Sequence, residues 1–440
     1  MSARPNVAHV NYHYFLSTQS FISFYLDSLN RYRPICLTRT PETDAIRKTT
    51  PNRIRHCLRI YGQKDGADSE SLIWRCGRLL RRTLSHMPLG LAQLGFHALN
   101  RWVIPRLRND SNSDAYLAWV RDILISESVQ IIHAYFGPVG WRMLTLKRQL
   151  NLPLVVTLLG DDVAPSLDPW WWWLVQKNRR DKQPNWPERL QELFSEADLI
   201  LVEGEYLRQK LIGLGADPSK VAVQRIALPL ASLPYSQATH EAKQRTTILF
   251  AGRFCERKGI LDALDAISRV WMVRQDFEFV MIGDDTLTDG LYASRVHDSI
   301  RRLRLEDCVR LLGFVDHQRY LQELSRADIF FHPSHVDSHG LTEGGAPTTI
   351  LEAQAMGVAV VATQHCDIPN ITLPGSSALL VNERNPAELA AALVSLLDAP
   401  DRRSRMGEAG RSFVSRNHDI SIEVLRLEEH YDELLRRCEP

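Results

Sequence analysis

Residues 332–363, HPSHVDSHGLTEGGAPTTILEAQAMGVAVVAT, contain a strand end, a long polar loop, a short helix and a buried strand. The apolar run Val358–Ala362 is typical of a parallel strand that is covered on both faces. Ahead of it, Ile350–Met356 is rich in helix-forming residues, and Gly357 is suited to end that helix. The stretch therefore predicts one loop–helix–strand unit of an α/β domain.

The loop in front of this helix has the composition of an anion site. Gly344 and Gly345 allow a ligand to approach the backbone closely, and Pro347 fits a first helical turn that Thr348 or Thr349 caps. The first N–H groups of a helix and its dipole favour a phosphate group. Two carboxylates frame the loop, one within it and one inside the helix: Glu343 and Glu352. An ordinary loop–helix unit with exposed carboxylates is the alternative.

This combination resembles the donor-sugar site of retaining glycosyltransferases with the GT-B fold, in the large family 4 that uses nucleotide sugars. In that family two glutamates eight residues apart bracket a glycine-rich loop and a helix start. The resemblance implies that Glu352 binds the ribose hydroxyls and that Glu343 lies beside the donor sugar. The spacing differs here, because Glu343 and Glu352 are nine residues apart.

Composition narrows the class of protein without naming a ligand. The chain has 440 residues, 44% hydrophobic and 24% charged, which suits a globular protein of two domains. The net charge of +1 indicates no particular partner. Seven scattered cysteines without a CxxC pair argue against a zinc site and fit a reducing compartment. The absence of a signal-peptide core and of a long apolar run predicts a cytoplasmic protein.

The N-terminal half begins with a βαβ pattern. Asn6–Tyr12 is predicted to be a strand, and the helical spacing that follows places Ile22, Tyr25, Leu26 and Leu29 on one face. Further strands are predicted at 34–40, 129–134, 154–159, 197–202 and 221–226, with a helix at 114–127.

Two segments of this half have a composition suited to a membrane surface. Residues 72–108 contain seven arginines, no acidic residue and many large apolar side chains. Four consecutive tryptophans, Trp170–Trp173, precede the basic run Lys177–Lys182, and adjacent indoles on a helix point about 100° apart. Both segments are interpreted as contacts with an anionic membrane, or alternatively as packed helices with solvated charges. Binding to nucleic acid is not expected, since no base-reading motif accompanies the arginines.

Three polar residues at predicted strand ends are candidates for the acceptor side: His133, Asp161 and Asp162. A histidine beside apolar neighbours is often structural, so His133 has two interpretations. The aspartates have no third ligand nearby and do not suggest a metal site. In relatives a histidine often stands at the position of Leu159, directly before Gly160, so this chain lacks a group expected near the sugar.

A linker is predicted at 229–245, where periodicity is lost, and a second domain starts with the strand Thr246–Ala251. The turn after that strand carries Arg253 and Lys258, a pair suited to a diphosphate. The resemblance assigns the corresponding pair to the leaving nucleoside diphosphate. Near Thr363, relatives often carry a glycine pair and a glutamate, whereas this chain reads HCDIPN.

Alternation of strands and helices predicts a parallel, doubly wound sheet in the second half, whose ligands bind at the carboxyl ends of the strands. Strands are predicted at 277–282, 309–312, 328–331 and 378–381, and helices at 386–397 and 420–437. The residues assigned to catalysis are Arg253, Lys258 and Glu343. Those assigned to donor binding are Gly252, Gly313, Phe314, Val315, Gly344, Gly345, Ala346, Pro347, Thr348, Thr349 and Glu352.

The resulting hypothesis is a metal-independent, retaining glycosyltransferase with two Rossmann-like domains facing across a cleft and a last helix that crosses back to the first domain. The predicted boundaries are 1–228, 229–245, 246–416 and 417–440. The donor is a nucleoside-diphosphate sugar, such as a UDP- or GDP-sugar, and no further cofactor is expected. The acceptor is a glycan, interpreted as a lipid-linked intermediate of surface polysaccharide assembly at the inner face of the membrane.

Other functions remain open at this point. A nucleotide-sugar-binding protein without turnover, a glycosyltransferase for a small soluble acceptor, and an epimerase or phosphorylase with the same fold all suit the pattern. A nicotinamide-dependent dehydrogenase does not, because no GxGxxG follows the first predicted strand.

Overall fold

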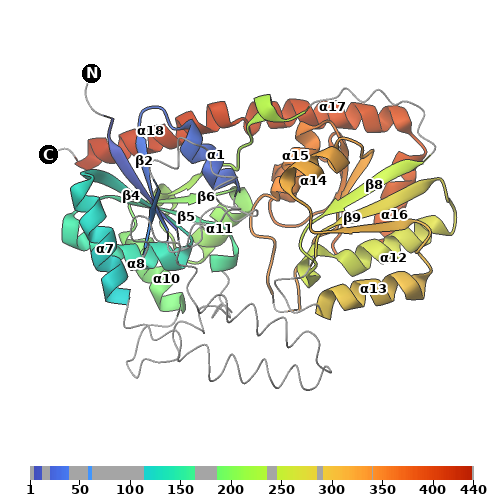
Figure 1. Cartoon of the computed structure of the whole chain (residues 1–440), viewed down its shortest axis with the longest axis horizontal. Helices are drawn as coiled ribbons and strands as arrows, with labels where there is room; N and C mark the ends of the chain where they lie inside the picture. The colour runs from blue at the N-terminus through green and yellow to red at the C-terminus, as the bar shows by residue number, and fades with distance from the viewer. Residues whose placement is uncertain are drawn as a thin grey trace, which may run out of the picture.

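The structure is a computed structural model in which two parallel sheets lie side by side (Figure 1). The structure describes residues 4–11, 20–38, 58–61, 113–163, 186–234, 245–284, 291–338 and 340–438. The segments 72–108 and 170–182, which are predicted to contact a membrane, lie outside these ranges. Among the helices within them, none combines the length and apolarity that crossing a bilayer requires.

The N-terminal sheet is parallel, with the strand order β3-β2-β1-β4-β5-β6-β7. Its strands are β1 (Asn6–Val10), β2 (Arg33–Thr38), β3 (Leu58–Ile60), β4 (Val129–Tyr135), β5 (Leu154–Leu158), β6 (Leu199–Val202) and β7 (Val221–Val223). Successive side chains point to opposite faces, so Val7 and Ala8 belong to different hydrophobic cores.

Helices cover both faces of this sheet. The core on one face includes residues of α7 (Ser113–Ser126), α8 (Gly137–Leu150), α10 (Trp186–Glu196) and α11 (Glu205–Gly213). The other core includes α1 (Ser20–Ser28) and the C-terminal helix. The predicted apolar face of α1 is confirmed, since Ile22, Tyr25, Leu26 and Leu29 are all buried. The short 3₁₀ turns of this half are η3 (Asp161–Val163), η4 (Pro218–Lys220) and η5 (Leu230–Ser232).

The C-terminal sheet is also parallel, with the order β10-β9-β8-β11-β12-β13. Its strands are β8 (Thr246–Ala251), β9 (Phe277–Ile282), β10 (Val309–Gly313), β11 (Ile329–His332), β12 (Ala359–Thr363) and β13 (Ala378–Val381). Its helices and turns are η6 (Glu256–Lys258), α12 (Ile260–Trp271), α13 (Leu291–Leu303), α14 (His317–Leu324), α15 (Thr348–Ala355), η7 (Ile368–Asn370), α16 (Pro386–Leu397) and α17 (Pro400–Asn417). The predicted bounds of β8, β9, β13 and α16 are confirmed.

The last helix, α18 (Ile420–Cys438), returns to the N-terminal domain as predicted (Figure 1). Glu428 accepts the backbone N–H groups of Asn30 and Arg31, both at 2.6 Å. Tyr431 is fully buried, and its hydroxyl lies 2.6 Å from Nδ1 of His133 in the middle of the sheet. The helix is therefore part of the core of the first domain, although it follows the second in sequence.

The chain passes between the domains at two points, and these points are hydrogen-bonded to each other. Leu228 donates its N–H to the carbonyl of His418 at 2.8 Å and accepts the N–H of Ile420 at 3.1 Å. Nδ1–H of His418 donates to the carbonyl of Ile226 at 2.7 Å. The domain boundaries predicted at 228 and 416 lie near this pair of crossings and stay predictions.

The contact between α18 and the sheet generates a prediction about stability. Tyr431→Phe removes the hydroxyl that binds His133 and leaves a buried ring nitrogen without that partner. We expect the free energy of unfolding to fall by about 1–3 kcal/mol in urea denaturation of the whole chain. Leu425→Ala, at an exposed position of the same helix, is the control and is expected to change little. Equal stability of the Tyr431→Phe variant and the wild type would contradict this account of how α18 is held.

Candidate active site

The candidate residues of the second domain gather where the strand order reverses. β8 lies between β9 and β11, so the chain leaves β8 towards one side of the sheet and arrives at β11 from the other. The loops after these two strands diverge from such a point and leave a crevice at the carboxyl edge of the sheet, which is where doubly wound sheets bind ligands. Arg253 and Lys258 follow β8, and Glu343 lies in the loop after β11.

Close backbone approaches shape the turn after β8. Gly259 has a φ of 64°, which favours glycine, and a Cβ at this position would overlap the carbonyl of Pro333. A Cβ at Gly283 would likewise overlap the carbonyl of Gly252. The glycines thus allow the loops after β8, β9 and β11 to lie against one another.

Glu343 is nearly buried and forms ion pairs with two cationic side chains of the 3₁₀ turn η6. Lys258 forms an ion pair with Oε2, and Nε of Arg257 lies 3.2 Å from Oε1. Burial alone would raise the pKa of Glu343, but the charges of Lys258 and Arg257 outweigh it and lower this pKa to about 2. The carboxylate therefore stays ionised at any physiological pH, and it holds Lys258 in one place. Sequence reasoning assigned Lys258 and Glu343 to the site but not their pairing, and it missed Arg257.

A second contact fixes the backbone of the loop at Glu343. The N–H of Glu343 donates to Nε2 of His365 at 3.1 Å, so this nitrogen carries the lone pair. Nδ1 of His365 therefore bears the proton and donates to Glu383 at 2.6 Å. His365 is buried and follows β12, which makes it a further residue at this edge of the sheet that sequence reasoning did not identify.

The helix start after the loop differs from the prediction. α15 begins at Thr348, and Pro347, which is predicted to lie in the first helical turn, occupies the N-cap position without a side-chain cap. The expectation that Thr348 or Thr349 caps the helix is therefore wrong. The first N–H groups of α15 have no partner within the helix and remain able to bind an anion.

Glu352 lies inside α15 with its side chain buried, and Oε1 is 2.8 Å from Nε2 of His317 at the start of α14. The hydrogen bond to Glu352 raises the pKa of His317 above its ordinary value. His317 is a functional candidate that sequence reasoning missed, although it lies only two residues after Val315. The loop before it holds Gly313, with a φ of 66°, and Phe314, whose side chain is 67% exposed.

Two of the three residues predicted for the acceptor side, His133 and Asp162, are buried within the first domain. His133 is 1% exposed, and its two ring nitrogens lie near the hydroxyls of Tyr431 and Thr157 at 2.6 and 2.7 Å. Asp162 is also buried, and its carboxylate accepts the N–H groups of Gly137, Leu159 and Gly160. These contacts fit structural roles. The side chain of Asp161 lies outside the described residues.

The two domains meet at the glycine-rich loop. The backbone of Gly344 lies against that of Gly160, and a Cβ at either glycine would overlap the other segment. The N–H of Ala346 donates to Oε2 of Glu203, at the end of β6, at 3.1 Å. The candidate donor loop is thus in direct contact with the first domain.

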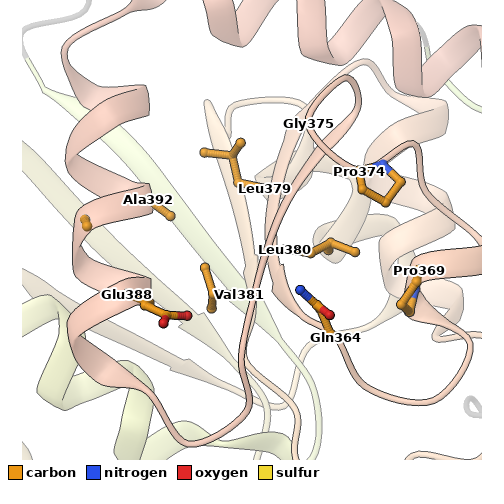
Figure 2. Close-up of a pocket in the computed structure, with 10 residues that line it drawn as sticks. Gln364, Pro369, Pro374, Gly375, Leu379, Leu380, Val381, Glu388 and Ala392 are labelled. Carbon is orange, nitrogen blue, oxygen red and sulfur yellow. The ribbon is translucent and has the colours of Figure 1, made fainter.

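An open cavity of roughly 500 Å³ lies elsewhere, beside the edge strand β13 and α16 (Figure 2). Leu379 and Leu380 project to opposite sides of β13, and none of the residues assigned to catalysis or donor binding lines the cavity. Within the described ranges, no group of three or more histidine, cysteine or acidic side chains is placed to bind a metal ion. Metal independence stays a prediction.

Comparisons with known proteins agree with this architecture. Residues 234–413 match the family described as glycosyl transferases group 1, and residues 54–226 match the glycosyl transferase 4-like domain. Anabaena Alr3699/HepE, solved in complex with UDP, superposes with a TM-score of 0.70 over 98% of this chain and 100% of that chain. Its sequence is 14% identical, so the similarity shows the fold alone, which is GT-B as predicted.

Two curated relatives have a higher sequence identity to this chain. The provisionally named colanic acid biosynthesis glycosyltransferase WcaL of Salmonella typhimurium is 28% identical over 262 residues, 59% of each chain. The amylovoran biosynthesis glycosyltransferase AmsK of Erwinia amylovora is 32% identical over 206 residues, 46% of this chain and 48% of its own. The chain thus spans about half to three fifths of the length of these relatives. With both of its halves matched, the chain belongs to the group 1, family 4-like glycosyltransferases.

Proposed function

We propose that the protein is a retaining glycosyltransferase that transfers a sugar from a nucleoside-diphosphate sugar to a glycan acceptor. The observation that carries the proposal is the ion pair of Lys258 and Glu343 at the switch point of the second sheet, in the loop that leads into α15. The family and the UDP bound by the Anabaena protein support a nucleotide-sugar donor. The retaining outcome and the absence of a metal requirement rest on the resemblance to family 4.

The chemistry needs positive charge where the sugar departs. When the bond between the anomeric carbon and the diphosphate oxygen breaks, negative charge develops on the diphosphate. Lys258 is held by Glu343, Arg253 is exposed at the neighbouring turn, and the N–H groups at Thr348 and Thr349 begin a helix. Donors fixed before the reaction stabilise such charge without reorganisation, which supplies several kcal/mol in known enzymes.

The other donor-binding assignments follow from their positions. Glu352 is proposed to bind the ribose hydroxyls, with His317 orienting its carboxylate. Gly313, Phe314 and Val315 form the loop after β10 that would meet the base. Gly252, Gly344, Gly345, Ala346 and Pro347 line the diphosphate side.

The acceptor is proposed to be a lipid-linked intermediate of surface polysaccharide biosynthesis, bound at the cytoplasmic face of a membrane. The two curated relatives are named for the biosynthesis of colanic acid and amylovoran. The basic and tryptophan-rich segments 72–108 and 170–182 provide the composition for a membrane contact. A soluble, small-molecule acceptor is the alternative within the same enzyme class.

A nucleotide-sugar-binding protein without turnover is the second candidate function. Two observations favour it: Leu159 stands where relatives often have a histidine, and Glu343 is already neutralised by Arg257 and Lys258. Detectable sugar transfer would exclude it.

Donor binding and transfer test the proposal directly. We expect one of UDP-, GDP- and ADP-sugars to raise the melting temperature of the protein by several degrees, because a ligand that binds only the folded state stabilises it. The identified donor is then incubated with lipid-linked saccharides, and transfer is measured as labelled sugar in the organic extract. Stabilisation by none of the three sugar classes would contradict the proposed donor class.

Removing the proposed diphosphate contacts should slow transfer. Lys258→Ala and Arg253→Ala are each expected to lower kcat about 10²- to 10³-fold, since each removes a charge that faces the departing diphosphate. Lys220→Ala, at a half-buried lysine in η4, and Arg301→Ala, at an exposed arginine in α13, are the matched controls. An Arg253→Ala variant with the kinetics of the controls would remove Arg253 from the site.

The pair of His317 and Glu352 predicts a pH dependence of donor binding. The pKa of His317 is raised above its ordinary value. The charged form of His317 and its ion pair with Glu352 are therefore fully present below pH 6.5, and both are lost as the pH rises through the raised pKa. We expect the Kd for the donor to increase over this range in wild type. His317→Gln should weaken binding about 3- to 10-fold at pH 6 and flatten the profile, as measured by isothermal titration calorimetry. An unchanged profile would contradict the role of His317.

A further inference from the structure

Loops from both domains meet beside the glycine-rich loop and exchange hydrogen bonds. In the first domain, Glu203 and Gly204 connect β6 to α11. In the second, His365–Asp367 connect β12 to the turn η7. Each connection contributes one buried carboxylate, and each carboxylate accepts a backbone N–H of the other domain.

Asp367 caps a helix of the other domain. α11 starts at Glu205 with Gly204 at the N-cap, and no side chain of its own caps it. Instead, Oδ1 of Asp367 accepts the N–H of Tyr206 at 2.9 Å, which is the bond that an N-cap side chain normally makes. Gly204 is required here because a Cβ at this position would overlap the carboxyl group of Asp367. A carboxylate also interacts favourably with the positive end of the helix dipole.

Glu203 makes the reverse contact. Its Oε2 accepts the N–H of Ala346, one residue before Pro347 at the N-cap of α15. A Cβ at Gly345 would overlap the carboxylate of Glu203, so the loop is shaped to admit this side chain. Nearby, Asp162 holds the turn at Leu159 and Gly160 through their N–H groups, and this turn touches Gly344.

We propose that Glu203 and Asp367 are positioning residues that form an interdomain clasp, which fixes the loop 344–347 at the mouth of the donor site when the domains are closed. The effect of the clasp on sugar transfer rests on the proposed function. Its effect on domain closure does not depend on that function. Glu203 acts through the backbone that leads into α15, and Asp367 acts through the start of α11.

The surroundings of Glu203 favour the protonated form of its carboxyl group at pH 7. Burial raises the pKa of Glu203 to about 8, and the neighbouring charges of Asp367 and Asp162 add to this, while the N–H of Ala346 opposes it. Oδ2 of Asp367 is buried and has no hydrogen-bond partner among the described residues. Above pH 8 a further negative charge would appear beside Asp367, so the clasp should weaken there.

Kinetics of single and paired variants test the clasp. Glu203→Ala and Asp367→Ala are each expected to lower kcat/KM for the donor about tenfold, and the double variant should lose little more, because the two residues act as a unit. Glu203→Gln imitates the protonated carboxyl, so it should retain more activity than Glu203→Ala and abolish the loss above pH 8. Glu205→Gln, at an exposed position two residues away, is the control.

A second pair of variants separates positioning from helix stability. Asp367→Gly combined with Gly204→Ser gives α11 a cap of its own and cuts its tie to the second domain. We expect this double variant to regain the melting temperature of wild type but to keep the reduced kcat/KM. Recovery of both quantities would show that Asp367 only caps the helix, and it would overturn the proposal.

Domain closure is measured on the same variants without any nucleotide, by small-angle X-ray scattering. The alanine variants and the relocated-cap variant should have a larger radius of gyration than wild type and Glu205→Gln. An unchanged radius would overturn the clasp. If wild type binds no sugar nucleotide at all, the proposed function fails, but the scattering result still decides whether the clasp exists.

Discussion

The position of β8 between β9 and β11 is the constraint on which the candidate site depends. Because all strands of this sheet are parallel, the loops after β8 and β11 leave at the same edge. The buried carboxylate of Glu343 then joins them, since a charge removed from water must be paired, and the cations it pairs with come from the turn after β8. One strand order thus determines which side chains can meet.

Much of the fold could be predicted because parallel strands buried on both faces appear as continuous apolar runs. β8 and β9 begin and end at the predicted residues for this reason, and so does β13, although it is a half-buried edge strand. Helix α17 was not predicted, because it is polar and contains Gly407 and Gly410, which disfavour helix. Its packing explains these glycines: a Cβ at Gly407 would overlap the carbonyl of Gly357. Such a close approach between distant segments leaves no local signal.

The candidate site was predictable as a set of loop residues but not as a set of pairs. Arg257, His317 and His365 were missed because their partners are selected by the tertiary structure, and spacing along the chain does not show them. His133 is the converse case, because the sequence allowed both a substrate contact and a structural role. It stands near a strand end as a substrate contact would, yet it binds Tyr431, 298 residues further along, in the core beneath α18. A histidine among apolar neighbours cannot be assigned until the elements that cover it are known.

The contacts between the domains are of two kinds, and their chemistry suits different tasks. At the crossings, backbone hydrogen bonds between Leu228 and the His418–Ile420 segment join the two connections, and α18 packs on the first domain through a buried apolar face. In the proposed clasp, contacts away from these crossings determine how far the domains open. Those contacts are carboxylates on backbone N–H groups at glycine-lined loops, which exchange for water at a net cost of only about 0.5–3 kcal/mol each. A buried anchor at one side and exchangeable polar contacts at the other would let the proposed clasp release and form again as the domains open for substrates.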